Sequence, residues 1–283
     1  MCTDKKSFRV VITGKGGVGK TTLTSCLATV LSQDGINVLA VDEDPQMNLP
    51  YALGLGVERA AQIIPLNLNS DYIEEKTGIN PKKNSWGSMF KLNPDVDDVV
   101  ERFGMKVADN LNLLVMGTVK QAGGGCLCAE NVLLDSTIRH LALRDNEGIL
   151  LDTQAGVEHF GRALSRGFSH CLIVSDDTFN ALTVACHSAE LARQIGIPNV
   201  CLVVNRASGR TADKLARFEK ETGTPLSNLF ETLYQLPLEP LLADLEPEVT
   251  KIMENSESLY STSVAALASR LCTSHCSCSA PAA

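Results

Sequence analysis

The stretch Gly14-Lys15-Gly16-Gly17-Val18-Gly19-Lys20-Thr21-Thr22 decides the fold of this chain. It contains the pattern G-x-x-x-x-G-K-[ST], which is typical of loops that bind nucleotide phosphates. Glycines allow consecutive backbone N–H groups to curve around an anion without a Cβ atom in the way. The stretch therefore predicts a phosphate-binding loop, and we expect it to contact the nucleotide through Gly14, Gly16, Gly17, Val18, Gly19, Lys20, Thr21 and Thr22.

The residues on both sides of this loop match the context that the pattern requires. An apolar run at residues 8–13 predicts a buried strand before the loop, and residues 23–31 predict a helix after it. The positive end of such a helix points at the same phosphates. We expect Lys20 to bridge the β- and γ-phosphates and the Thr21 hydroxyl to bind Mg²⁺.

The composition bounds the class of protein. The chain has 283 residues, 44% hydrophobic and 20% charged, which suits one α/β domain with a substantial core. A net charge of -8 without a basic stripe argues against nucleic acid and anionic membranes as partners. No apolar run reaches the ~18 residues of a membrane span, and no signal-like segment precedes the first strand, so we expect a cytoplasmic protein.

Strand-like and helix-like runs alternate along the chain. Parallel strands that alternate with helices predict a doubly wound α/β fold, a mostly parallel sheet of about seven or eight strands with helices on both faces. The ligand of such a sheet lies at the carboxyl edge of the strands. Beyond residues 8–13, strands are predicted at residues 37–41, 111–116, 148–152, 170–175 and 200–205, and further helices at about 180–195 and 256–271.

We assign residues 1–271 to one ATPase domain, followed by a tail at residues 272–283. The segment at about residues 57–110 is predicted to be an irregular, partly helical insertion, because prolines and polar clusters interrupt its apolar runs. The tail holds Cys272, His275, Cys276 and Cys278, which could bind Ni²⁺ or Zn²⁺. We favour the interpretation that the tail is disordered and that its cysteines are incidental.

Carboxylates stand at the ends of two predicted strands. Asp42-Glu43-Asp44-Pro45 follows the strand at 37–41, and Asp152 ends the strand at 148–152. Carboxylates placed beside a phosphate-binding loop hold Mg²⁺ and the attacking water. Asp152 suits the magnesium side of the site, and Gly156 in the next segment can turn its N–H group toward the γ-phosphate.

Ten cysteines is a high number for the cytoplasm, where disulfides are not expected. Four of them lie in apolar helix or strand patterns and are interpreted as core residues, namely Cys26, Cys171, Cys186 and Cys201. Cys126 and Cys128 follow three glycines, and side chains two apart share one face of an extended segment. Two thiolates leave a metal short of ligands, so the same loop of a second copy would complete a Cys₄ site on a dimer axis.

The loop G-K-G-G-V-G-K-T-T resembles the deviant P-loop of the ATPases that include the nitrogenase iron protein and the division-site and chromosome-partitioning ATPases. This resemblance implies an ATP-dependent homodimer in which Lys15 crosses the interface to the partner's nucleotide, as an arginine finger does in trans. It also places switch I at residues 42–45. There the pattern D-x-D-P makes Asp44 the candidate for orienting the attacking water, with Asp42 nearer the metal.

A narrower resemblance rests on G-G-C-L-C-A-E-N at residues 124–131 and on residues 152–159. Both look like the ATPases that mature carbon monoxide dehydrogenase, and the likeness extends over about residues 10–267. It implies that the paired cysteines bind nickel at the dimer interface and that the carbon monoxide dehydrogenase apoenzyme is the client. Gln46 departs from that family, which has an acidic residue there, and His159 is interpreted as a packed or capping residue.

The expected nucleotide is ATP. Asn205 ends the strand at residues 200–205 and is predicted to contact the base. A guanine site needs a carboxylate three residues later, and Ser208 at that position favours adenine. Leu236-Pro237-Leu238 resembles the second base-contacting loop of the family, in which Pro237 would act through its backbone.

Two other functions stay open. An iron–sulfur electron carrier resembling the nitrogenase iron protein would also use four cysteines, but residues 153–158 contain no cysteine where that relative has a ligand. A partitioning or positioning ATPase would bind DNA or a membrane. The acidic C-terminal region lacks the basic amphipathic helix that membrane adhesion needs.

Overall fold

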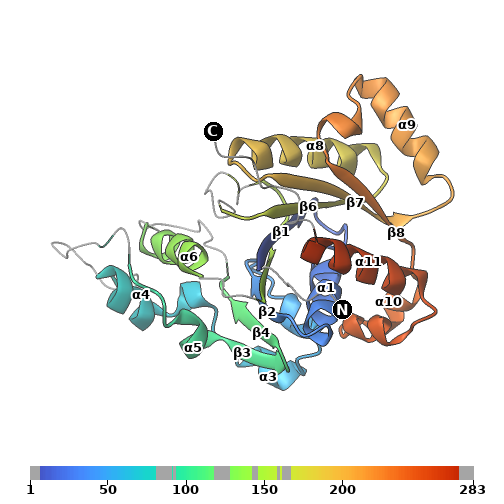
Figure 1. Cartoon of the computed structure of the whole chain (residues 1–283). Coiled ribbons are helices and arrows are strands. Elements are labelled where there is room, and N and C mark those ends of the chain that lie inside the picture. The colour runs from blue at the N-terminus through green and yellow to red at the C-terminus, as the bar shows by residue number, and fades with distance from the viewer. Residues whose placement is uncertain are drawn as a thin grey trace, which may run out of the picture.

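Eight strands form a single sheet (Figure 1). The computed structural model describes residues 7–80, 91, 94–117, 128–141, 146–157, 160 and 167–273. Within these residues the strand order is β3-β4-β2-β5-β1-β6-β7-β8, and each neighbouring pair is parallel except β3 with β4. The strands are β1 Phe8–Gly14, β2 Asn37–Asp42, β3 Met105–Ala108, β4 Leu111–Val115, β5 Glu147–Asp152, β6 His170–Ser175, β7 Asn199–Ala207 and β8 Thr232–Pro237. The predicted doubly wound, mostly parallel sheet is confirmed.

Helices cover both faces of the sheet. The longer ones are α1 Lys20–Gln33, α4 Ser70–Thr77, α6 Cys128–His140, α8 Phe179–Gln194, α9 Thr211–Thr222 and α11 Leu259–Thr273. Shorter ones are α2 Leu49–Ala52, α3 Val57–Ala61, α5 Val99–Phe103 and α10 Leu241–Leu245, with 3₁₀ turns η1 Leu66–Leu68, η2 Leu226–Asn228 and η3 Val249–Glu254. No helix in the described part of the chain is long and apolar enough to span a membrane.

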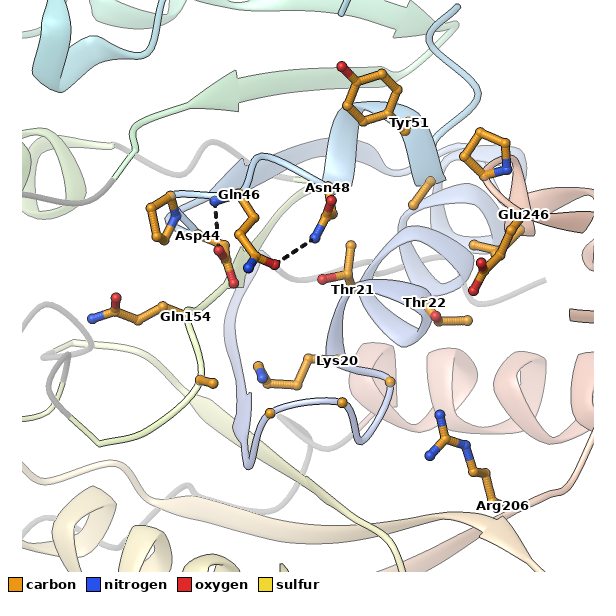
Figure 2. A pocket seen from close by; sticks show the side chains of 18 residues that line it. Lys20, Thr21, Thr22, Asp44, Gln46, Asn48, Tyr51, Gln154, Arg206 and Glu246 are labelled. Carbon is orange, nitrogen blue, oxygen red and sulfur yellow. Dashed lines mark hydrogen bonds between the residues drawn. The ribbon is translucent and has the colours of Figure 1, made fainter. Parts of the chain in front are cut away.

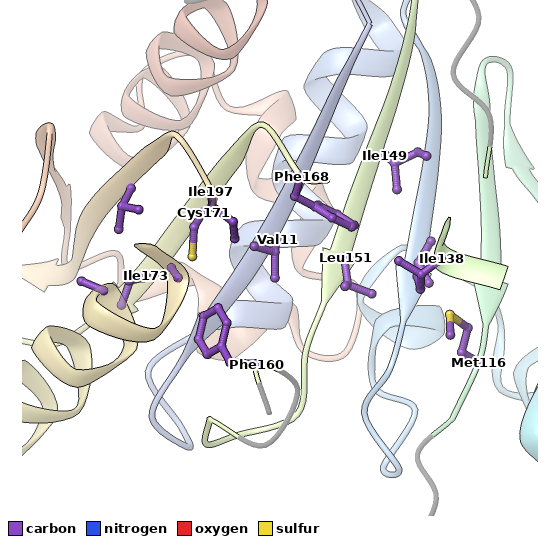
Figure 3. Close-up of a cluster of buried hydrophobic side chains, with 14 of the residues drawn as sticks. Val11, Met116, Ile138, Ile149, Leu151, Phe160, Phe168, Cys171, Ile173 and Ile197 are labelled. Carbon is purple, nitrogen blue, oxygen red and sulfur yellow. The ribbon is translucent and has the colours of Figure 1, made fainter. Parts of the chain in front are cut away.

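Two apolar cores lie on the two faces of the sheet. Successive side chains of a strand point to opposite faces, so β1 sends Val11 into one core and Val10 and Ile12 into the other. The first core packs against α6 and α8, and Figure 3 shows part of it around Val11. The second packs against α1 and α11. Burial on both faces explains why the central strands are continuous apolar runs and were predictable from the sequence.

The structure differs from the prediction in several places. Helix α1 begins at Lys20, because the last residues of the phosphate-binding loop are already its first turn. The segment at residues 57–110, predicted to be irregular and partly helical, contains the four-residue edge strand β3, in which only alternate residues are partly buried. Helix α11 runs to Thr273, so Cys272 is helical and packs against the second core. Residues 274–283 lie outside the described part of the chain.

Arg9 on β1 joins the sheet to the end of α6. Its guanidinium donates to the carbonyl oxygen of Leu141 and, at 3.5 Å, to that of Ile138. Partial burial lowers the pKa of Arg9, and the positive group lies where the helix dipole is negative. The interaction places the carboxyl end of α6 at the amino edge of the sheet, so its first turn lies at the opposite, carboxyl edge.

We expect Arg9→Met to lower the free energy of unfolding by about 1–3 kcal/mol, because two carbonyl groups lose a charged donor. Arg139→Met is the matched control, since Arg139 is a half-exposed residue of the same helix whose ion pair with Asp135 is worth about 0.5 kcal/mol. Urea unfolding of both variants measures the difference. Equal losses would show that Arg9 does not anchor α6.

Candidate functional site

The phosphate-binding loop joins β1 to α1 and depends on glycine at two positions. A Cβ atom on Gly14 would lie 2.0 Å from the carbonyl oxygen of Val174 on the neighbouring strand β6. Gly19 is the N-cap of α1 and has a φ of 96°, in the left-handed region that favours glycine. The loop therefore cannot follow this path with a side chain at either position.

A cavity of about 900 Å³ lies over this loop and the first turn of α1, at the carboxyl edge of the sheet (Figure 2). Four segments line it. The loop contributes Gly16, Gly17, Gly19, Lys20, Thr21 and Thr22, and the segment after β2 contributes Asp44, Pro45, Gln46, Asn48, Tyr51 and Ala52. Gln154 and Ala155 follow β5, and Arg206, Glu246, Pro247 and Val249 come from the C-terminal part of the chain.

Lys20 lies on the floor of the cavity and is only 7% exposed (Figure 2). Its ammonium donates to the carbonyl oxygen of Lys15 at 3.2 Å. Burial lowers the pKa of Lys20, while attraction to Asp152 and Asp44 opposes that shift. Lys20 is thus a desolvated positive charge facing the cavity, as phosphate binding requires. Lys15 is exposed, and its predicted role across a dimer interface stays a prediction.

Asp152 and Asp42 are fully buried carboxylates beside the loop. Asp152 accepts hydrogen bonds from the hydroxyls of Thr21 at 2.7 Å and Thr24 at 3.2 Å. Burial raises the pKa of Asp152 to about 6, with hydrogen bonds from Thr21 and Thr24 and the charge of Lys20 opposing the shift. Burial and then repulsion from Asp152 raise the pKa of Asp42 well above its ordinary value.

These groups fit magnesium. The Thr21 hydroxyl and the carboxylates of Asp42 and Asp152 form an oxygen-only donor set, which Mg²⁺ prefers. A divalent cation would also offset the repulsion from Asp44, which adds to the effect of burial in raising the pKa values of Asp42 and Asp152. The residues that the sequence predicts for the metal are therefore gathered at one side of the cavity.

We expect Asp152→Asn to raise the free energy of unfolding of the magnesium-free protein by about 2–3 kcal/mol at pH 7.5, since one pKa unit corresponds to about 1.4 kcal/mol. The pKa of Asp152 in the folded protein, about 6, lies above its ordinary value of 3.8. Its neutral form therefore stabilises the fold below pH 3.8, and this stability is lost as the pH rises through about 6. Asparagine cannot ionise, so Asp152→Asn does not lose this stability as the pH rises.

Urea unfolding in a chelator between pH 4 and 8 measures the effect. Asp213→Asn, an exposed carboxylate on α9, is the control for removing one charge. Added Mg²⁺ with nucleotide should stabilise the wild type and not Asp152→Asn. The same pH dependence in wild type and Asp152→Asn would contradict the assignment of the raised pKa.

The segment after β2 presents polar side chains to the cavity. Asp44 accepts a hydrogen bond from the backbone N–H of Gln46 at 2.8 Å, and its own N–H donates to Asp42 at 2.9 Å. Asn48 donates to the side-chain oxygen of Gln46 at 3.3 Å. Figure 2 shows Asp44 above Lys20, on the side of the cavity where Gln154 also lies. This is the region in which a water molecule could face the terminal phosphate.

The segment after β5 is attached to β1. Thr153 donates through its hydroxyl to the carbonyl oxygen of Ile12 at 2.9 Å, and Gly156 forms an antiparallel bridge with Gly14. Gln154 and Ala155 line the cavity, whereas Gly156 lies beside Gly14. The predicted contact between Gly156 and the γ-phosphate stays a prediction.

The residues predicted to contact the base do not line the cavity. Asn205 donates to the carbonyl oxygen of Val18 at 2.8 Å, and Pro237 pairs with Ala207 in the sheet. Arg206 and Glu246 lie at the end of the cavity away from Asp44 (Figure 2), and Pro247 also lines the cavity. None of these three residues was predicted from the sequence to line the site. Arg206 could have been found as the neighbour of Asn205, but no local signal marks Glu246 or Pro247.

The predicted transition-metal site lies largely outside the described residues. Cys126 and His159 are not among them, and Cys128 is described only as the first residue of α6. Among the residues that the structure does describe, no group of three metal-binding side chains is present. Cys126 and Cys128 therefore stay candidates.

The sequence is similar to a family of nucleotide-binding proteins. Residues 9–234 match the model of the CobQ/CobB/MinD/ParA nucleotide binding domain. An uncharacterized ATP-binding protein of Methanocaldococcus jannaschii is 41% identical over 76% of this chain and 80% of its own length. The carbon monoxide dehydrogenase accessory protein CooC of Rhodospirillum rubrum is 35% identical over 82% of this chain and 88% of its own length.

Solved structures agree on the fold. The MinD cell division protein of Aquifex aeolicus superposes with a TM-score of 0.63 at 22% identity, covering 98% of this chain and 100% of that chain. MinD of Pyrococcus horikoshii, solved with Mg-ADP, has a TM-score of 0.63 at 21% identity, covering 94% of this chain and 96% of that chain. With its phosphate-binding loop, buried carboxylates and matching family model, the chain belongs to the CobQ/CobB/MinD/ParA family of nucleotide-binding P-loop ATPases.

Proposed function

We propose that the protein is an ATP-hydrolysing, homodimeric metallochaperone that binds nickel through Cys126 and Cys128 of two chains. Its client would be a carbon monoxide dehydrogenase, into which it helps to insert the metal. Zinc is the alternative ion, because paired thiolates accept it at least as readily. The 35% identity to the accessory protein CooC supports this proposal, as does the C-x-C segment itself.

One structural observation carries the proposal. The chain leaves β4 at the carboxyl edge of the sheet, and α6 begins at Cys128 and returns to the amino edge, where Arg9 holds its end. The first turn of α6 therefore lies at the same edge as the nucleotide cavity. The C-x-C segment ends at the first residue of this turn in the sequence, so a metal bound there would be within reach of a change in nucleotide state.

A hydrogen-bonded connection links the two regions. The backbone carbonyl of Asp42 accepts from the N–H groups of Met116 at 2.9 Å and Gly117 at 3.3 Å. Gly117 is the last described residue before the segment that contains Cys126. The side chain of the same Asp42 belongs to the proposed magnesium site. A shift of Asp42 on nucleotide binding would therefore move the start of the metal-binding segment.

The residues of the cavity have separate roles in the proposed ATPase reaction. Lys20 would bind the β- and γ-phosphates, and Lys15 of the partner subunit would add a second positive charge as the bond breaks. Asp44 would orient the attacking water. Thr21, Asp42 and Asp152 would hold Mg²⁺, which when bound neutralises charge on the phosphates.

Metal titration tests the proposal. Wild type and Cys126→Ala/Cys128→Ala are titrated with nickel and with zinc, with and without a non-hydrolysable ATP analogue, while light scattering reports molecular mass. The wild type should dimerise and share each metal ion between two chains. The double variant should still bind the ATP analogue but lose the metal.

Two controls sharpen this experiment. Cys186→Ala, a half-buried cysteine on α8, should bind metal as the wild type does. A chain ending at Thr273 removes His275, Cys276 and Cys278, and unchanged stoichiometry would exclude these three residues as metal ligands. A wild type that stays monomeric in every mixture would overturn the proposal, and iron with sulfide in anaerobically purified protein would support the electron-carrier alternative.

A further inference from the structure

A second cavity, of about 390 Å³, lies at the amino edge of the sheet. Residues near the start of β2, β4 and β5 form its floor, and α5 with the residues just before it and Leu141 after α6 form its walls. It lies at the opposite edge from the nucleotide cavity, and the two share none of the lining residues that the structure describes. Small-molecule sites typically enclose about 300–1,000 Å³, so this cavity is large enough for a ligand.

The walls of this cavity are apolar and held by packing. Val96 and Val99 on the side of α5, Ile149 on β5 and Leu141 after α6 are all buried members of the first core. The carbonyl oxygen of Leu141 accepts a hydrogen bond from Arg9, so this wall is attached to β1. The cavity is therefore a hollow at the rim of the first core, with a surface that suits a hydrocarbon group.

Three polar side chains come from the strands that form the floor. Asn37 is paired with Glu147 across β2 and β5, two residues before the pair of Leu39 with Ile149. Leu39 is also paired with Asn112 on β4. Side chains two apart on a strand share one face, and Leu39 and Ile149 pack in the first core, so the three polar side chains point to that same face. Asn112 is exposed although β4 has a neighbouring strand on each side, because it lines the cavity.

The cavity carries negative charge. Asp97, just before α5, adds a second carboxylate to that of Glu147. Among the lining residues that the structure describes there is no lysine, arginine or histidine. Lys106 on the edge strand β3 is bound to Asp109 at 2.8 Å, and the guanidinium of Arg9 is bound to carbonyl oxygens at the end of α6. The polar part of the cavity therefore favours a ligand with a positive charge.

We propose that this cavity binds a small organic cation, an ammonium or guanidinium group attached to a hydrocarbon body. The charged group would bind Asp97 and Glu147, within reach of the two asparagine amides, and the hydrocarbon would pack against the apolar walls. Hydrogen bonds between ionised groups are about twice as strong as neutral ones, and burial of the hydrocarbon adds to them. The site goes beyond the proposed function and depends neither on ATP hydrolysis nor on metal delivery.

Calorimetric titration of the full chain with three probes tests this inference. The probes 2-phenylethylamine, 2-phenylethanol and 3-phenylpropionate share one hydrocarbon body and carry a positive, a neutral and a negative group. The amine should bind saturably and about tenfold more tightly than the alcohol, whereas the anion should not bind. A saturating ATP analogue should leave the affinity for the amine unchanged. Displacement by the analogue, equal binding of the anion, or no saturable binding of the amine would overturn the inference.

Variants of the lining residues locate the probe. Asp97→Asn should lower the affinity for the amine about tenfold and leave that for the alcohol unchanged. Glu101→Gln is the matched control, since it removes an exposed carboxylate of α5 that does not line the cavity, and it should change neither affinity. Val100→Phe fills the cavity, so it should abolish binding of amine and alcohol while its urea unfolding stays cooperative. An unchanged affinity for the amine in Asp97→Asn would place the probe elsewhere and overturn the inference, even if Val100→Phe fails to fold.

Discussion

Replacing Lys20 by alanine is expected to weaken ATP binding by about 10²–10⁴-fold, because a charge-assisted hydrogen bond is worth about 1.5–3 kcal/mol and Lys20 would make one to each of two phosphates. The side chain is almost completely buried at the floor of the cavity, where burial lowers the pKa of Lys20 and attraction to Asp152 and Asp44 opposes that shift. Such a desolvated charge interacts with phosphate more strongly than one in water. Titration with ATP, measured as heat or as fluorescence, gives the loss.

Lys15→Ala is the matched control, since it removes a lysine from the same loop. Lys15 is exposed and does not line the cavity, so this variant should bind ATP with the affinity of the wild type. It should nevertheless hydrolyse ATP more slowly if Lys15 acts across a dimer interface. Unchanged ATPase rate and unchanged ATP-dependent dimerisation would disprove the role in trans, and full ATP affinity in Lys20→Ala would disprove the assignment of Lys20.

The parts of the fold that the sequence predicts well are those decided by neighbouring residues. The apolar runs that became β1, β2, β5, β6 and β7 are buried on both faces, so each is recognisable by itself. The loop after β1 is also recognisable by itself, because its glycines, Lys20 and Thr21 all lie within residues 14–21. Strand β3 was not predicted, since four residues at a sheet edge, of which only two are partly buried, carry almost no pattern.

In the candidate site, too, the residues that neighbouring sequence decides were predictable and the others were not. Asp42 and Asp152 were predictable as carboxylates at the ends of strands, and β2 and β5 are neighbours in the sheet. Glu246 was not predictable, because a segment far along the chain brings it to the cavity. Asn205 was predictable as a residue of the site, but its hydrogen bond to the carbonyl oxygen of Val18 was not, since nothing in the sequence indicates it.

Asp44→Asn is expected to lower kcat for ATP hydrolysis by about 10²–10³-fold while ATP still binds, since a positioned general base contributes about 10²–10⁴-fold. The asparagine keeps the size of the side chain and can still accept the hydrogen bond from the N–H of Gln46. It loses the negative charge that orients and activates water. It also removes one of the charges that raise the pKa of Asp42 and Asp152, so magnesium binding should weaken little.

Asp95→Asn is the matched control for Asp44→Asn. Asp95 also accepts a hydrogen bond from the N–H two residues later, at 3.1 Å, but it is exposed and does not line the cavity. Its ATPase rate should equal that of the wild type. Because Asp44→Asn binds ATP without cleaving it, ATP itself should hold this variant as a stable dimer, which light scattering detects. If Asp44→Asn hydrolyses ATP at the wild-type rate, another polar residue of the cavity must orient the water. Gln154 would be the first to test, because it lies on the same side of the cavity (Figure 2).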